Sequence, residues 1–192
     1  MLEFLAFLNS LCPLSPEAQA AMLKVCSEKR LRKGQHLLRE GETCRHLAFI
    51  KHGLMKVCFE SGSKEVALWY NKEMEAVISV QSFYSQTPSR LSIRCVEDTE
   101  LVLVPYIEIE HLYDRYPEYN RHARLILQHY YSMSEAHVTL LLQSMKVRYQ
   151  IVARIYPWML TDHRITDKML AAYLGMTPAS LCSCKKELRV AW

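Results

Sequence analysis

Glycine is scarce in this sequence, with five residues among 192, and this scarcity excludes several enzyme classes. A phosphate-binding P-loop and a dinucleotide-binding fingerprint need clustered glycines, because backbone amides must approach the phosphates closely. Serine hydrolases of the nucleophile-elbow type need Gly-x-Ser-x-Gly. None of these patterns occurs, and the eight histidines show no metal-ligand spacing. We therefore expect no enzyme, no catalytic residue, no metal and no cofactor.

Long apolar runs are also missing. No stretch of about 18 apolar residues occurs, so the sequence predicts no membrane-spanning helix and no membrane partner. The first residues, MLEFLAFLNSLCPLSPEAQ, carry acidic rather than basic charge and break at Pro13, unlike a signal peptide. Seven irregularly spaced cysteines predict reduced thiols and a cytoplasmic protein.

The charge is small overall but unevenly spread. From Met145 onward, eight basic residues stand against three acidic ones, a net charge of +5, whereas residues 1–144 carry −1. A basic C-terminal part fits a polyanionic partner held by this part of the chain. The alternative is an ordinary solvated basic face.

The chain begins with helical and then with strand-like segments. Residues 1–27 are expected to be helical, with Ser15, Pro16 and Glu17 as a good helix start. Short segments rich in β-branched and aromatic residues then predict strands at 46–53, 54–60, 64–71, 91–98 and 100–105. Such a succession of strands predicts an antiparallel sandwich or roll.

A long helix is expected from Glu118 to about Leu142, where no Gly or Pro interrupts the chain. Residues at alternating spacings of four and three, which are typical of two packed helices, are Ile126, Tyr130, Met133, His137 and Leu140, followed by Ser144 and Val147. The first five are the predicted homodimer interface. The alternative is that this stripe packs on its own body.

Further helices are expected at 146–160, at 166–175 and from Pro178 onward. The predicted fold class is therefore α+β: an antiparallel β-roll at 1–112, a long dimerisation helix at 113–145 and a small helical domain at 146–192.

The last two expected helices fit a helix-turn-helix, in which two short helices cross almost at right angles. Gly175 can supply the turn residue with positive φ, and Ala171, one helical turn earlier, supplies the small residue at the crossing. Thr166 and Thr177 can cap the two helices. The apolar residues expected to hold them together are Leu170, Leu174, Leu181, Cys184 and Leu188. Two ordinary core helices can mimic this pattern.

The second of these helices carries Cys182-Ser183-Cys184, which is not a metal site. Side chains two residues apart on a helix point about 200° away from each other, so the two thiols cannot hold one ion. We expect Cys184 in the core. The expected DNA-binding residues are Thr166, Thr177, Ala179, Ser180, Cys182, Ser183, Lys185, Lys186 and Arg189.

Two stretches, KGQHLLREGETCRHLAFIKHG at 33–53 and RYQIVARIYPWMLTDHRITDKMLAAYLGMTPASL at 148–181, resemble transcription regulators of the Crp/Fnr family. The first resembles the opening of the family's β-roll, with Gly34, Gly41 and Gly53 at its turns. The second resembles its DNA-binding half. The resemblance implies a cyclic-nucleotide-binding-like β-roll, a dimerisation helix and a C-terminal helix-turn-helix. It also implies DNA, a second copy of the chain and RNA polymerase as partners.

The chain departs from the family where cyclic AMP would bind. Members that bind this nucleotide carry a Gly-Glu pair and, further along, an arginine followed by a small residue. Residues 75–98, EAVISVQSFYSQTPSRLSIRCVED, lack the pair, so we expect no ordinary cyclic AMP binding. The residues expected around any effector pocket are Ser79, Val80, Ser89, Arg90 and Ser92. Arg90 could anchor an anion or be a solvated loop residue.

Two other modes of sensing are weighed from the cysteines and histidines. An iron–sulfur cluster needs a close group of cysteines, and Cys12 and Cys26 are too few and too far apart. Haem ligands could come from Cys44, His46, His52, Cys58 and Cys95. Each of these is explained more simply as a core cysteine or a surface histidine.

The recognition helix also departs from the resembling regulators, which tend to have Ser-Arg where this chain has Cys182-Ser183. A lost bidentate arginine would remove about 1–3 kcal/mol of base discrimination. A second interpretation therefore stands beside the first: a regulator that acts through protein contacts and has a degenerate DNA-binding domain.

Overall fold

The computed structural model describes the backbone of residues 1–61 and 64–189, and side chains at 1–59 and 66–187. The chain forms two compact units, Met1–Gln128 and His129–Trp192. The long helix α5 (Glu118–Leu141) begins in the first unit and ends in the second. The three-part division expected from the sequence stays a prediction.

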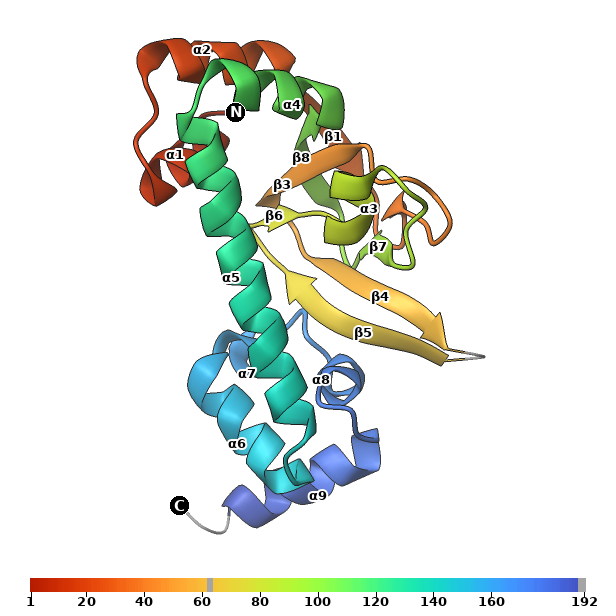
Figure 1. The fold of residues 1–192 in the computed structure, drawn as a ribbon. Coiled ribbons are helices and arrows are strands. Elements are labelled where there is room, and N and C mark those ends of the chain that lie inside the picture. The colour runs from red at the N-terminus through yellow and green to blue at the C-terminus, as the bar shows by residue number, and fades with distance from the viewer. Residues whose placement is uncertain (62–63, 190–192) are drawn as a thin grey trace. The chain divides into compact units, whose positions relative to one another are not determined.

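The first unit is an antiparallel roll of two four-stranded sheets (Figure 1). One sheet has the order β1 (Ser27–Leu31), β8 (Thr99–Pro105), β3 (His46–His52) and β6 (Ala76–Val77). The other has the order β2 (His36–Leu38), β7 (Ser92–Cys95), β4 (Met55–Ser61) and β5 (Lys64–Asn71). The predicted α+β class is confirmed, and the five expected strands are β3, β4, β5, β7 and β8.

Three strands, β1, β2 and β6, were not anticipated from the sequence. β1 reads Ser-Glu-Lys-Arg-Leu, and its one buried residue is Leu31. It lies at the edge of its sheet and pairs with β8 alone. Charged side chains on an edge strand discourage pairing with other chains, and they also remove the apolar alternation by which strands are predicted.

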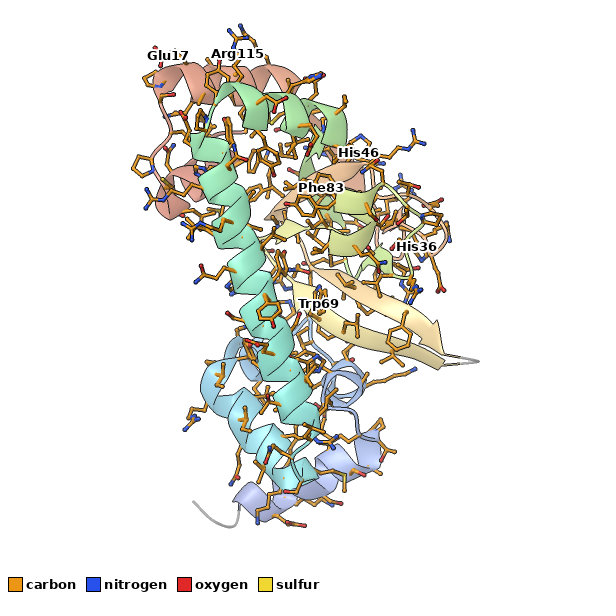
Figure 2. The ribbon with its side chains drawn as sticks, in the orientation of Figure 1. Glu17, His36, His46, Trp69, Phe83 and Arg115 are labelled. Atoms are coloured by element: carbon orange, nitrogen blue, oxygen red, sulfur yellow. The ribbon has the colours of Figure 1, made fainter. Side chains whose placement is uncertain are left out.

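Helices close the ends of the roll. α1 (Leu2–Leu11), α2 (Pro16–Val25) and α4 (Tyr106–Arg115) gather at one end, beside the start of α5 (Figure 1). The predicted cap of α2 is confirmed, because Ser15 Oγ accepts a hydrogen bond from the Ala18 amide at 3.2 Å. The short helix α3 (Val80–Ser85) packs through Phe83, which is fully buried (Figure 2).

A buried histidine joins α1 to α5. His122 Nδ1 lies 2.8 Å from the Glu118 carbonyl, and its Nε2 lies 2.9 Å from the carbonyls of both Leu8 and Cys12. Through these three carbonyls, one side chain ties the C-terminal end of α1 to the first turn of α5.

The second unit contains α6 (Met145–Ile155), α7 (Trp158–Thr161), α8 (Asp167–Tyr173) and α9 (Pro178–Arg189). The single helix expected at 146–160 is wrong, because the chain leaves the helical conformation at Tyr156 (φ −124°, ψ 55°). Pro157 follows and disfavours that conformation in the residue before it. Among the described residues, no helix is long and apolar enough to cross a membrane.

Candidate nucleic-acid interface and effector cavity

The turn between α8 and α9 depends on Gly175. Its φ is +62°, a conformation that side chains with a Cβ rarely adopt. A Cβ there would lie 3.0 Å from Leu141 Cδ2 and 3.2 Å from Arg148 Nη1. Two features therefore require glycine at this position: the positive φ of the backbone and the lack of room for a Cβ.

Arg148 closes this turn from α6. Its Nη1 donates to the carbonyls of Leu174 at 2.9 Å and Gly175 at 3.2 Å, and its Nε donates to the carbonyl of Gln143 at 2.9 Å. In the sequence Arg148 counts as one more basic residue of the C-terminal part. No local pattern marks it as the residue that holds the helix-turn-helix together.

The two helices are packed and capped as expected. Leu170, Ala171, Leu174, Leu181 and Cys184 are all buried, which confirms the expected core. Thr166 Oγ1 accepts from the Met169 amide at 3.3 Å, and Thr177 Oγ1 accepts from the Ser180 amide at 3.1 Å. The side chains of Leu188 and Arg189 lie outside the described residues.

α9 presents a face of small side chains to solvent. Ala179, Cys182, Ser183 and Lys186 are exposed, and Ser180 is half-buried. Cys182 is exposed and Cys184 is buried, so the two thiols point away from each other as expected. Among the expected DNA-binding residues of α9 whose side chains are described, only Ser180 and Lys185 are half-buried, and the others are exposed. None of these described residues is an arginine.

Several cations of the second unit are engaged within the chain. The Lys185 ammonium pairs with Asp167 of α8, and Lys146 Nζ lies 3.7 Å from Glu187. Arg164 Nη2 lies 2.7 Å from Asp162, whose pKa its hydrogen bonds hold below the usual range. All three acidic residues after Met145 are therefore paired. Lys146 is itself exposed, and the other exposed lysine and arginine side chains in the described part of this unit are Arg154, Lys168 and Lys186.

In the first unit, a cavity of about 100 Å³ lies beside α3. Trp69 of β5 lines it (Figure 2), and its buried Nε1–H has no hydrogen-bond partner among the described residues. The other lining residues are Ser79, Val80, Gln81, Ser82, Pro88, Ser89, Arg90 and Leu91. None of them is acidic, and Trp69 was not anticipated because it is distant in sequence from the others.

Two buried serines link the two sides of this cavity. Ser79 and Ser89 are each 3% exposed, and their hydroxyl oxygens lie 2.8 Å apart. Ser89 Oγ also lies 2.8 Å from the Leu91 carbonyl and 3.0 Å from its amide. Of the expected pocket residues, Ser79, Val80, Ser89 and Arg90 line the cavity, with Arg90 exposed. Ser92 does not line it; its Oγ accepts from the Glu40 amide instead.

Comparisons with known proteins agree with this architecture. Residues 28–116 match the family model described as cyclic nucleotide-binding domain. The structure is similar to FixK2 of Bradyrhizobium japonicum (TM-score 0.72, 16% identity, 87% of this chain and 86% of that chain covered). It is also similar to the c-di-GMP-responsive global regulator CLP of Xanthomonas campestris (0.71, 16%, 92% and 93%). A protein of Eubacterium rectale, described as a regulator of the Crp/Fnr family, matches similarly (0.70, 13%, 93% and 85%). The chain has the fold of the Crp/Fnr regulators. No curated protein sequence matches it.

The cysteines considered as sensors in this Crp/Fnr fold are free thiols. Cys44, Cys58 and Cys95 are buried, and burial raises the pKa of the Cys44 and Cys95 thiols. Burial also raises the pKa of Cys26 to about 11. A raised pKa disfavours the thiolate, which is the form that ligates metals.

Three of the five expected dimer residues on α5 are engaged within their own unit. Ile126 lines an apolar cavity of about 40 Å³ in the first unit. In the second unit, the His137 ring stacks on Tyr173 at 4.3 Å and its Nε2 donates to the Tyr173 carbonyl at 2.9 Å. Leu140 is 3% exposed. The remaining two, Tyr130 and Met133, are half-buried. These contacts are the kind that the alternative interpretation expects, and the homodimer interface itself stays a prediction.

The opposite face of α5 carries exposed apolar side chains. Tyr131 is 67% exposed and Val138 is 62% exposed, and Leu142, directly after the helix, is 80% exposed. At about 100° per residue, these three lie within one narrow stripe, whereas Leu140 lies about 180° from Tyr131. α5 ends at Leu141 and Ser144 occupies the N-cap position of α6, so the expected stripe does not continue to Val147.

Proposed function

We propose that this chain is a DNA-binding transcription regulator of Crp/Fnr type that acts as a homodimer in the cytoplasm. The observation that carries the proposal is the complete helix-turn-helix, in which Gly175 and Arg148 hold the turn while α9 stays exposed along one face. The proposed role is regulatory rather than enzymatic, with RNA polymerase as a further partner.

Most of the affinity for DNA would come from phosphates. Arg154, Lys168 and Lys186 are exposed cations that could neutralise phosphate charges, which supply affinity and salt dependence but no sequence reading. Thr177, Ser180 and Ser183 offer hydroxyls to phosphates or base edges. We therefore expect moderate sequence preference and a steep loss of affinity as salt rises.

The dimer would form through the exposed stripe of α5, namely Tyr131, Val138 and Leu142, rather than through the residues expected from the sequence. Large exposed apolar side chains on one stripe are typical of a helix that packs against another helix. Such a dimer would place two α9 helices about 34 Å apart on a near-palindromic site.

Gating by cyclic nucleotide is not part of the proposal. The cavity beside α3, about 100 Å³, is smaller than the roughly 300–1,000 Å³ typical of ligand pockets. No lining carboxylate could accept a hydrogen bond from a ribose hydroxyl. The effector, where one acts, is expected to differ from cyclic AMP.

DNA binding can be tested with genomic fragments and with selected random duplexes over a range of salt concentrations. Lys186→Ala should weaken binding to all sequences alike and reduce the slope of log K against log salt by about 1. The matched control is Lys24→Ala, an exposed lysine on α2 in the first unit. Absence of any salt-dependent binding by the wild-type protein would overturn the proposal.

A second candidate function is regulation through protein contacts with a degenerate DNA-binding domain. The observation that favours it is the exposed face of α9, which has no arginine among its described side chains. A steep salt dependence with no preferred sequence would support this candidate. Recovery of one palindrome from the random duplexes would eliminate it.

The dimer can be tested by sedimentation. Val138→Glu should shift the protein towards monomer, because a buried unpaired carboxylate opposes the packing of the two helices. Ile107→Glu replaces a similarly exposed apolar residue on α4 and should leave the mass in solution unchanged. A dimer that persists in Val138→Glu would show that the interface lies on another face of the chain.

A further inference from the structure

Three turns of the roll bring together one histidine and two glutamates. His52 ends β3, Glu73 follows β5, and Glu97 follows β7. One ligand atom of each lies within 4.8 Å of the other two. Over residues 1–59 and 66–187, where side chains are described, this is the only group of three potential metal ligands so close together. We propose that the cluster binds one divalent transition-metal ion of the Mn²⁺ or Zn²⁺ class.

The backbone holds two of these turns against β3 and the turn that follows it. The Ile50 amide donates to the Glu75 carbonyl at 2.9 Å, and the Met74 amide donates to the Ile50 carbonyl at 3.0 Å. The Val96 amide donates to the Leu54 carbonyl at 2.8 Å. The ligand-bearing residues thus start from fixed backbone positions, which reduces the conformational entropy lost when an ion binds.

Gly53 brings the turn after β3 against β8. Its φ is +112°, and a Cβ there would lie 2.5 Å from Thr99 Oγ1 and 2.9 Å from Thr99 Cα. Its amide donates to Glu73 Oε1 at 2.9 Å, and that oxygen lies 3.8 Å from His52 Nδ1. The carboxylate of Glu73 is therefore oriented beside the imidazole.

The chemistry of the cluster fits a divalent cation. It offers one imidazole nitrogen and two carboxylate groups, which are ligand types that divalent metal ions take in proteins. Metal–ligand distances of about 2.0–2.2 Å separate neighbouring ligand atoms by roughly 3–3.5 Å, so small side-chain rotations would suffice. Mixed imidazole and carboxylate ligands suit Mn²⁺ and Zn²⁺. His52 is exposed, so water can complete the coordination.

The site is independent of the proposed DNA binding and is tested in the metal-free chain of 192 residues. We expect one equivalent of Mn²⁺ to bind, as measured by calorimetry and by electron paramagnetic resonance. Mn²⁺ is the first probe because the seven free thiols prefer softer ions. His52→Ala and Glu97→Gln should each weaken binding by about tenfold or more, at least as much as removing a residue that orients a ligand.

The chain offers a matched control. His111 Nδ1 lies 3.8 Å from Glu108 Oε2 on α4, the same separation as in the His52–Glu73 pair. This second pair belongs to no group of three ligands among the described side chains. His111→Ala should leave Mn²⁺ affinity unchanged.

A second readout is thermal stability. Mn²⁺ should raise the melting temperature of the wild type and of His111→Ala, because it binds the native state. The rise should vanish in Glu97→Gln, whose circular dichroism should match the wild type since Glu97 lies in a surface turn. Zn²⁺ should bind more tightly than Mn²⁺. No saturable binding, or binding equally strong in His52→Ala, would overturn the proposal.

Discussion

The helix-turn-helix and the cavity beside α3 differ in whether the same side chains both stabilise the fold and form the proposed binding surface. In α9, Leu181 and Cys184 are buried and hold the scaffold, while Cys182 and Ser183 face solvent. Beside α3, Ser79 and Ser89 are buried, bond to each other and line the cavity at the same time. We therefore expect that the α9 residues proposed to meet DNA can change with little loss of stability, whereas any change in the cavity must keep its buried hydroxyls bonded.

The largest effect is expected at the glycine of the turn. Gly175→Ala should lower the free energy of unfolding by about 3 kcal/mol, because it combines positive φ with a Cβ close to Leu141 and Arg148. Gly34 has φ +82° and nothing within 4 Å of a Cβ, so Gly34→Ala should cost only about 1 kcal/mol. Urea unfolding would measure both, and equal losses would show that packing around the turn contributes nothing.

Two serine substitutions test whether changes cost more stability in the cavity than on the exposed face of α9. Ser89→Ala should lower the free energy of unfolding by about 1–3 kcal/mol, because it removes this partner from the buried Ser79 hydroxyl and from the half-buried Leu91 amide. Ser183→Ala should change it by less than about 0.5 kcal/mol, as is usual at an exposed position. Similar losses of unfolding free energy in the two variants would contradict this difference between the cavity and α9.

A substitution at Ser183 should increase sequence discrimination in DNA binding. Ser183→Arg would restore an arginine where the resembling regulators carry one, and it should add about 1–3 kcal/mol of discrimination between preferred and random duplexes. Its unfolding free energy should match that of the wild type. Tighter binding to all duplexes alike would show that the new arginine meets only phosphates.

A smaller, pH-dependent effect is expected in the second unit. Burial lowers the pKa of His137 below its ordinary value of 6.5. The unfolded chain then binds the proton more readily, so the stability contributed by neutral His137 is present above about pH 6.5 and is lost as pH falls below it. His137→Gln should reduce the difference in stability between pH 7 and pH 5. His163→Gln, at an exposed histidine, should not.

No effect at all is expected from cyclic AMP. A ligand that binds only the native state raises the melting temperature, and we expect no rise across a concentration series because the cavity is small and lacks an acidic residue. A concentration-dependent rise would show that the cavity beside α3 keeps the family's ligand after all.

Prediction from the sequence succeeded where the signals are local. The strand segments, the start of α2 at Ser15 and the turn at Gly175 are each encoded within a few residues, so pattern and propensity suffice. It missed β1 and could not choose between the faces of α5, because packing decides both. The charged edge strand β1 has no apolar alternation, and the face of α5 that stays exposed depends on what the rest of the chain covers. Apolar periodicity alone cannot distinguish a stripe buried in the chain's own core from one that pairs with a second copy.

By itself the sequence determined the order of roll, long helix and helix-turn-helix, because hydrophobic periodicity, caps and turn residues act over short distances along the chain. Only the tertiary structure decided that Arg148 closes the turn, that Lys185 pairs with Asp167, and that His52, Glu73 and Glu97 meet. These arrangements join residues far apart in the chain. Their partners are chosen by the packing of whole elements, so no short stretch of sequence encodes them.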